Sequence, residues 1–186
     1  ELENKIFNRI NSSKRGGGYY MWKPYIILKW LNKLKEGDIL IYTDSGLSLN
    51  RKNIKEKFIE YILKVKENSL LCFPEKYIEK NWTKMEIFKH FGVENDKRFT
   101  HTVQYFGGVL HVIKVCDYSK KIYQEWWDII RGNPQLVDDS LTLKNFEGFR
   151  ENRRDQSIWS ILCKKYNVME GDKRGNIPTL GARRRY

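Results

Sequence analysis

The sequence has few of the residues that define special classes of protein. Its three cysteines, at positions 72, 116 and 163, form no C-x-x-C pair, and their odd number argues against a disulfide framework. Four prolines and 13 glycines exclude a collagen-like chain. The apolar stretch 25–34 is interrupted by Lys29, Asn32 and Lys33, so it falls short of the ~20 apolar residues that a membrane helix needs. We therefore expect a protein of a reducing, cytoplasmic compartment.

The remaining composition is that of a folded protein. Hydrophobic residues make up 40% and charged residues 31% of the 186 residues, enough for one domain with a core. We expect a single α/β domain at residues 1–170 and a basic tail at 171–186. The sequence does not begin with methionine, and residues 2–10 already have the apolar spacing of a helix. We therefore expect a fragment that is truncated at its amino end.

Positive charge is in clear excess. Lysine and arginine number 35 against 23 acidic residues, a formal net charge of +12, which should attract polyanions or phosphate groups. Arg150, Arg153, Arg154 and the run 183–185 would suit a nucleic-acid-binding module. No helix-turn-helix, zinc-finger or RNP signature accompanies them, so we expect no specific nucleic acid as a partner. The arginine-rich tail would equally suit peripheral contact with an anionic membrane.

Apolar spacing predicts helices that alternate with short strands. The predicted helices are 2–10, 24–36, 52–66, 83–90, 119–131 and 155–166. The predicted strands are 39–42, 70–73 and parts of 103–115, which Gly107 and Gly108 interrupt. Residues 134–152 have no regular pattern. This alternation favours an α/β fold with a mostly parallel sheet flanked by helices.

Two segments are predicted to meet at one edge of that sheet. In open α/β sheets, ligands lie beyond the carboxyl ends of the strands. Asp44 follows the strand 39–42, and Gly107 and Gly108 interrupt a later β-rich stretch. We therefore expect a ligand site centred on Asp44.

Four segments resemble a known family. They are RGGGYYMWKP at 15–24, GDILIYTDSG at 37–46, QYFGGVL at 104–110 and RDQSI at 154–158. The sequence resembles the nucleotide-diphospho-sugar transferases, which are glycosyltransferases of the GT-A fold, and in particular a bacterial and large-virus group with RGxGYxxWKP and GDILxYxDxG motifs. The likeness spans residues 15 to about 166. It implies a Rossmann-like GT-A fold that here lacks the family's first strand.

The resemblance implies a divalent cation, Mn²⁺ or Mg²⁺, held by Asp44. In the family, the acid at the strand tip belongs to a DxD-like motif that holds the cation against the donor diphosphate. Here the motif is Asp44-Ser45-Gly46, without its second acid. Metal binding would then be weaker, or Asp155 or a histidine would supply the missing ligand, or Arg15 and Lys23 would replace the metal. From the residues alone, Asp44 also fits an Asx-turn after a strand.

The first motif is expected to bind the donor. The resemblance implies that Arg15, Tyr19, Trp22 and Lys23 contact the nucleotide sugar or its diphosphate, with the glycines at 16–18 bringing backbone N–H groups close to phosphate. The residues alone leave alternatives open. A glycine run is also typical of a mobile surface loop. Tyr19, Tyr20 and Trp22 would suit stacking on a base or a sugar ring, but aromatic residues beside a helix are more often part of a core.

The two later motifs are expected to complete the site. Gly107 and Gly108 would leave room for the donor sugar, although a β-bulge explains glycine there equally well. Asp155 and Gln156 would contact the sugar, although Asp155 also suits the first turn of a helix. The resemblance implies that Asp155 and Asp44 are catalytic.

These inferences predict a glycosyltransferase. The expected partners are a nucleotide-sugar donor and a glycan or lipid-linked acceptor, as in synthesis of surface polysaccharide. The paired acids Asp138 and Asp139 would contact the acceptor or be solvated. Two alternatives remain open at this point, a basic nucleic-acid-binding module and a transferase-like domain without activity. We expect Arg15, Lys23, Asp44, Gly107 and Asp155 to surround one cleft.

Overall fold

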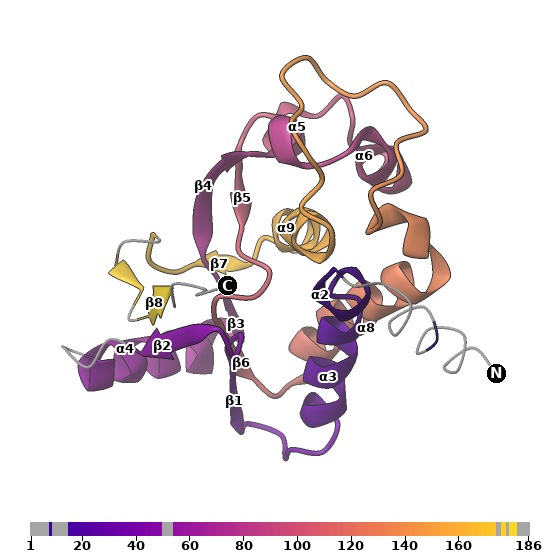
Figure 1. The fold of residues 1–186 in the computed structure, drawn as a ribbon. Helices are drawn as coiled ribbons and strands as arrows, with labels where there is room; N and C mark the ends of the chain where they lie inside the picture. Colours follow the sequence, from indigo (N-terminus) through magenta and orange to yellow (C-terminus); the bar gives the residue numbers. More distant parts are fainter. Residues whose placement is uncertain (1–7, 9–14, 50–53, 174–175, 178, 182–186) are drawn as a thin grey trace.

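The largest sheet in the described part of the chain has four strands. The computed structural model describes residue 8 and residues 15–49, 54–173, 176–177 and 179–181 (Figure 1). The strand order is β1–β6–β3–β7, with bounds Ile39–Tyr42, His111–Lys114, Leu70–Cys72 and Met169–Glu170. Strand β6 is antiparallel to both β1 and β3, whereas β3 and β7 are parallel.

The sheet is therefore mixed, and the expectation of mostly parallel pairing is wrong. A short apolar run reports that a strand is buried but carries no information about the direction of its partner. Here β6 lies between β1 and β3 and runs opposite to both. The coarser expectation of an α/β fold, with helices against a sheet, is confirmed.

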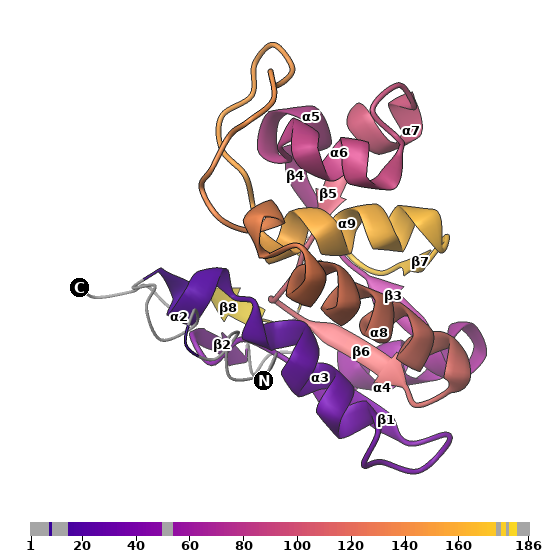
Figure 2. The same ribbon diagram turned by 90° about the vertical axis from the view of Figure 1, so that its right-hand side faces the viewer.

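Helices cover both faces of the sheet. Leu70, Cys72 and Ile113 face one hydrophobic cluster, which includes residues of α3 (Trp22–Leu31), α8 (Asp117–Gly132) and α9 (Asp155–Lys165). Leu71 and Val112 face a second cluster, with Tyr61 and Val65 of α4 (Ile54–Asn68). Figures 1 and 2 show α4 on the opposite side of the sheet from α3 and α8. The alternation of side chains along β3 and β6 thus divides the core into two layers.

The remaining elements are short. Two further pairs of strands are antiparallel: β4 (Pro74–Ile78) with β5 (Val103–Tyr105), and β2 (Leu47–Leu49) with β8 (Thr179–Gly181). The short helices are α2 (Gly16–Tyr19), α5 (Glu79–Trp82), α6 (Met85–Phe91), α7 (Lys97–Thr100) and the 3₁₀ turn η1 (Pro134–Leu136). The predicted irregular region 134–152 contains only η1.

Most predicted elements lie within a few residues of the observed ones. Helices α8 and α9 confirm the predictions at 119–131 and 155–166. Helix α6 ends at Gly92, whose positive φ of 65° makes the left-handed cap that glycine favours. Two differences matter for the site. Helix α3 begins before Pro24 and ends at Leu31, and Gly107 and Gly108 lie in the loop between β5 and β6 rather than inside a strand. The predicted helix 2–10 lies outside the described residues except for position 8.

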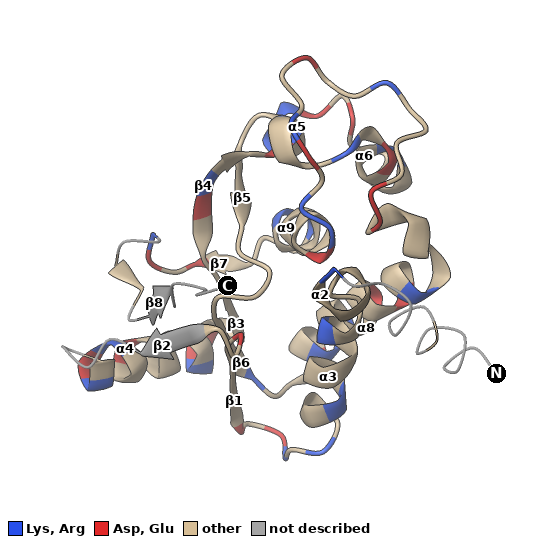
Figure 3. Cartoon of the chain, in the orientation of Figure 1, with Lys and Arg blue, Asp and Glu red and all other residues tan. Residues whose placement is uncertain are grey.

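Basic residues are spread over several elements. Figure 3 shows lysine and arginine on α3, α4, α5 and α9. The first residues of the predicted tail pack against α4. Asp172 pairs with Lys57 at 2.8 Å and accepts a hydrogen bond from Tyr61. The arginines at 183–185 lie outside the described residues. Over the described part of the chain, no helix combines the length and apolar character that crossing a membrane requires.

A histidine lies in the centre of the aromatic core. His111 is 1% exposed, and its Nδ1 lies 2.6 Å from the hydroxyl of Tyr123. The rings of Trp126 and Trp159 pack against it, with centroids 6.0 and 4.8 Å away. Burial, helped by the positive charge of Lys23, lowers the pKa of His111 to about 3, against the opposing effect of a hydrogen bond with the backbone of Gly107. The imidazole is therefore neutral at physiological pH.

This histidine should make the fold sensitive to acid. Between a folded pKa of about 3 and an ordinary pKa of about 6.5, the unfolded chain binds the proton and the folded chain does not. Stability should therefore fall as the pH is lowered through this window, by up to about 1.4 kcal/mol per pH unit. Urea unfolding at several pH values between neutral and acidic would measure the slope.

A His111→Phe variant should have a flatter dependence of stability on pH, whatever its absolute stability, because it removes the titrating group. The exposed His101 provides the control, since His101→Gln should keep the wild-type slope. Equal slopes in the wild type and His111→Phe would contradict the assignment.

Candidate functional site

Strand directions explain why distant segments meet at one edge of the sheet. Strands β1 and β3 are both antiparallel to β6, so they run in the same direction and their carboxyl ends share an edge. The residues that precede β6 lie at that same edge, because β6 runs the opposite way. Asp44 follows β1, and Gly107 and Gly108 precede β6. The backbone N–H of Asp44 donates to the carbonyl oxygen of Gly108 at 3.0 Å, which joins the two segments directly.

A cavity of about 370 Å³ opens at this edge. Its residues come from the start of α3, the end of β1, strand β4, the loop before β6 and the start of α9. They are Tyr20, Lys23, Asp44, Glu75, Tyr77, Phe106, Gly107, Gly108, Val109, Arg153, Arg154, Asp155 and Gln156. Six of the expected site residues, from four separate segments, are therefore among those that border the cavity.

Lys23 is the charged centre of the cavity. Its side chain is only 4% exposed, and its ammonium lies 2.9 Å from the carboxylate of Asp155 and 3.6 Å from that of Asp44. Asp155 is equally buried, at 5%, whereas Asp44 is 39% exposed. The hydroxyl of Tyr42 donates to Asp44 at 2.8 Å. The three charged groups therefore hold α3, β1 and α9 together at the edge of the sheet.

Burial and charge set the protonation of these groups. Burial alone would lower the pKa of Lys23, but the carboxylates of Asp155 and Asp44 outweigh it and raise that pKa above its ordinary value. Burial raises the pKa of Asp155 to about 6, against the opposing effect of Lys23. Burial and the charge of Asp44 also raise the pKa of the Tyr42 phenol. At neutral pH, Lys23 and Asp155 form an ion pair and Tyr42 is a neutral donor.

The two glycines allow close packing around this charged centre. A Cβ atom on Gly108 would collide with the carboxylate of Asp44 and the ammonium of Lys23. A Cβ atom on Gly107 would lie 2.7 Å from the Cα atom of Gln156, at the start of α9. At both positions the backbone passes directly against the site, a reason for glycine that differs from both expectations, room for the donor sugar and a β-bulge.

The glycine-rich segment forms an unusual turn. Gly16, Gly17, Gly18, Tyr19 and Tyr20 all have positive φ angles, between 55° and 83°. Their backbone N–H to carbonyl bonds follow helical spacing, so α2 is a turn with left-handed dihedral angles.

Tyr20 is the aromatic residue of this segment that reaches the cavity. The ammonium of Lys23 lies 5.2 Å from the centre of its ring. Tyr19 packs against the main core, and the indole of Trp22 donates to the carbonyl oxygen of Gly16 at 3.0 Å. Neither is among the residues that border the cavity.

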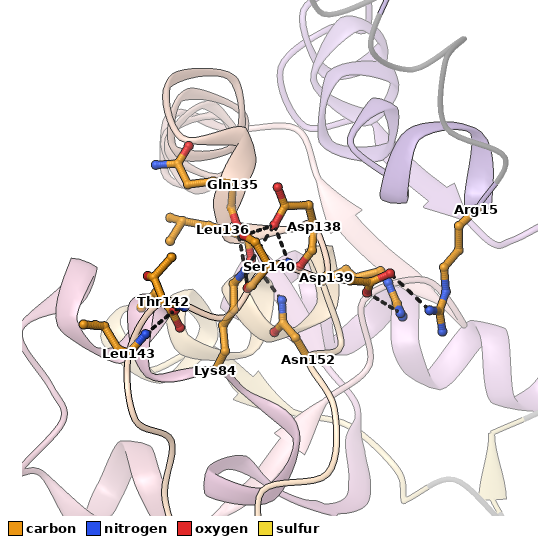
Figure 4. A network of polar contacts seen from close by, with 12 residues as sticks. Arg15, Lys84, Gln135, Leu136, Asp138, Asp139, Ser140, Thr142, Leu143 and Asn152 are labelled. Atoms are coloured by element: carbon orange, nitrogen blue, oxygen red, sulfur yellow. Dashed lines mark hydrogen bonds and ion pairs between the residues drawn. The ribbon is translucent and has the colours of Figure 1, made fainter.

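Arg15 lies outside the cavity. Its guanidinium pairs with Asp139 at 3.3 Å and with Glu151 at 3.6 Å, and its side chain is 52% exposed. Asp139 also pairs with Arg154, which does border the cavity, at 3.0 Å. Figure 4 shows Arg15 reaching toward Asp139 from the α2 segment. Arg15 is therefore linked to the cavity only indirectly, through Asp139 to Arg154 and through Glu151, which lies 3.8 Å from Arg153.

Two arginines border the cavity that the sequence analysis did not place among the site residues: Arg153 was interpreted as part of a basic cluster, and Arg154 as part of that cluster and of the RDQSI motif. The guanidinium of Arg153 lies 4.5 Å from the ring centre of Tyr77 and 4.4 Å from that of Trp82. Arg154 precedes α9 with φ 56° and ψ −122°, a costly conformation for a residue with a side chain. Strain of this kind is common at functional sites, but no sequence pattern reports it.

A chain of buried side chains fixes the orientation of Gln156. The Gln156 amide nitrogen donates to Gln104 at 2.9 Å, Gln104 donates to Thr83 at 2.7 Å, and Thr83 donates to Glu79 at 2.6 Å. Glu79 is fully buried and pairs with Lys164 at 2.5 Å. An ionised carboxylate only accepts hydrogen bonds, so it sets the direction of every donor along the chain. The amide oxygen of Gln156 is left to face the loop before β6.

A buried lysine anchors the irregular loop beside the site. The ammonium of Lys84 donates to the backbone carbonyls of Gln135, Asp138 and Ser140, at 2.6, 3.1 and 2.8 Å (Figure 4). Its side chain is completely buried. Asp138 therefore helps to hold the loop, and Asp139, in the same loop, pairs with the arginines at positions 15 and 154.

The residues at Asp44 do not fit the divalent cation that the resemblance implies. The carboxylates of Asp44 and Asp155 already face the ammonium of Lys23. Within the described ranges, no group of three or more histidine, cysteine, aspartate or glutamate side chains could hold a metal ion. A dication beside Asp44 would lie close to a buried positive charge, which is unfavourable at low local dielectric.

The comparisons with known proteins give no match. No protein-family model matches the chain, and neither a curated protein nor a solved structure matches it. The interpretation of this site therefore depends on the chemistry and geometry of its own residues.

A Gly108→Ala substitution should destabilise the protein. The added methyl group would push against the pair formed by Lys23 and Asp44, and overpacking of this kind costs about 1–3 kcal/mol. Gly132 is the matched control, because a Cβ atom there meets nothing within 4 Å and the residue ends α8. Gly132→Ala should be neutral or stabilise by up to about 1 kcal/mol. Urea unfolding of both variants tests the difference, and equal effects would mean that the space at Gly108 is unimportant.

Proposed function

We propose that the cavity binds a nucleotide-diphospho-sugar and that the protein transfers the sugar to a hydroxyl group of a glycan or lipid-linked acceptor. The observation that carries this proposal is the convergence of Lys23, Asp44, Asp155 and Gln156, with the glycines before β6, around one cavity. These residues come from motifs that resemble those of glycosyltransferases and are up to 133 positions apart in the sequence (156 minus 23).

The size and lining of the cavity suit such a ligand. A volume of about 370 Å³ lies within the range of ligand pockets, about 300–1,000 Å³. Tyr20, Tyr77 and Phe106 border it and offer aromatic surface for a base or a sugar ring. In this proposal Tyr20, one of the three aromatic residues that the sequence suggested for stacking, takes that role in place of Tyr19 and Trp22.

The positive groups suit the chemistry of the transfer. The bond between the sugar carbon and the diphosphate oxygen breaks, a bond to the acceptor oxygen forms, and the proton of the acceptor hydroxyl passes to the released diphosphate or to water. Negative charge therefore grows on the leaving diphosphate. Lys23, Arg153 and Arg154 border the cavity, and fixed positive charge of this kind stabilises the transition state more than the ground state.

The two carboxylates have different roles in this proposal. Asp155 is buried against Lys23 and keeps the ammonium in place. Asp44 is 39% exposed, so its free edge is available to accept hydrogen bonds from sugar hydroxyls. Gln156, held in one orientation by Gln104, adds a polar group beside them.

Binding of the donor is the first test. In a thermal-shift panel of nucleotide sugars, we expect saturable stabilisation by one donor or by a few related donors, followed by detectable sugar transfer. An Asp44→Asn variant should bind that donor about 10- to 100-fold more weakly, because hydrogen bonds to a charged group contribute about 1.5–3 kcal/mol. Asp128→Asn, on the exposed face of α8, should bind like the wild type.

The alternatives give different results in the same experiments. A protein that binds a nucleotide sugar saturably but transfers nothing to any acceptor would be a transferase-like domain without activity. A chain that ignores every nucleotide sugar but shifts DNA in a salt-dependent manner would be a nucleic-acid-binding module, and the proposal would be wrong.

A further inference from the structure

We infer that Lys23 is the permanent cation of this site and that the diphosphate of the donor is bound without a divalent metal ion. The inference rests on the proposed function for its ligand. It departs from the metal-dependent binding that the sequence resemblance implies, and three features of the site support it.

The first feature is the position of the ammonium. Its nitrogen lies 2.9 Å from Asp155 and 3.6 Å from Asp44, where a cation shared by two carboxylates would lie. A lysine ammonium is a compact charge, and burial within an ion pair keeps this one in place. A metal ion would have to displace Lys23, leaving a buried amine without its carboxylate partner. Such a loss is strongly destabilising.

The second feature is the close packing between the pair and the backbone of Gly108. The backbone at Gly108 is so close that even one added carbon atom would collide with both the Asp44 carboxylate and the Lys23 ammonium. Mg²⁺ and Mn²⁺ need several oxygen ligands arranged around them, and Mg²⁺ usually keeps some of its water. The inner side of the pair, between Asp44, Lys23 and Gly108, has no room for that coordination shell.

The third feature is the balance of charge along the cavity. Three cationic side chains border it, Lys23, Arg153 and Arg154, together with three carboxylates, Asp44, Glu75 and Asp155. Among the described residues that border the cavity, the cations equal the acids in number, so this lining has no net negative charge to attract a dication.

The wild-type protein provides the first test. Isothermal titration would measure binding of inorganic pyrophosphate, UDP, GDP and any nucleotide sugar identified by the thermal-shift panel. Each would be titrated once in EDTA and once in Mn²⁺. We expect the dissociation constants in the two conditions to agree within about threefold, far less than the change that a lost charge-assisted contact would cause. We also expect Mn²⁺ alone to leave the melting temperature unchanged.

A Lys23→Met variant provides a sharper test. It keeps much of the length of the side chain but removes its charge, so Asp44 and Asp155 face each other without a cation. We expect this variant to bind the diphosphate probes about 10- to 100-fold more weakly in EDTA and to acquire a stabilisation by Mn²⁺ that the wild type lacks. Lys29→Met, an exposed lysine on the same helix, is the matched control and should behave like the wild type.

The outcomes separate this inference from the proposed function. If the wild type binds diphosphates only with Mn²⁺, or if Mn²⁺ raises its melting temperature and Asp44→Asn abolishes that effect, the inference is overturned while the proposed function stands. If no diphosphate or nucleotide sugar binds in either condition, the proposed function fails and metal-free diphosphate binding fails with it. Should Lys23→Met not fold, the two wild-type measurements still decide between these results.

Discussion

The buried ion pair between Lys23 and Asp155 is the interaction on which the rest of the site depends. It joins the first turn of α3 to the first turn of α9, and Asp44 adds the end of β1 to the same contact. Two charges removed from water are stable only when each compensates the other, so these elements must pack together for either charge to be tolerated. The same contact therefore closes the core and brings an ammonium to the cavity.

Hydrogen bonds around the site restrict the side chains that border it. Gln156 is oriented by a chain that ends at the buried carboxylate of Glu79, and the loop that carries Asp139 is held by Lys84. Both anchoring residues are completely buried and lie outside the cavity. The polar groups of the site thus come largely from loops and helix ends, yet their geometry is set by the interior.

The sequence predicted features of the fold and the site that depend on residue type. It was less informative about features that depend on which strands pair or which distant residues come into contact. The apolar run before Asp44 predicted a strand with an acid at its end, and this is what the structure contains. The same run could not report that β6 would pair antiparallel on one side of it. Residue type also could not distinguish Tyr20, which reaches the cavity, from Tyr19, which faces the core. No sequence motif indicated that Glu79 would anchor the hydrogen-bond chain, because that role depends on residues from other elements, such as Lys164.

The left-handed turn at 16–20 has a consequence for the chirality of its residues. Natural L-residues disfavour this backbone because Cβ approaches the following carbonyl oxygen, and D-residues favour it for the mirror-image reason. The three glycines of the turn are achiral and adopt this left-handed backbone without strain. Tyr19 and Tyr20 adopt it at a cost in free energy that packing must offset. In a chemically synthesised protein, D-alanine at Gly17 or Gly18 would therefore suit the local backbone better than L-alanine. At these positions, D-amino acids would stabilise a fold that is otherwise made of L-amino acids.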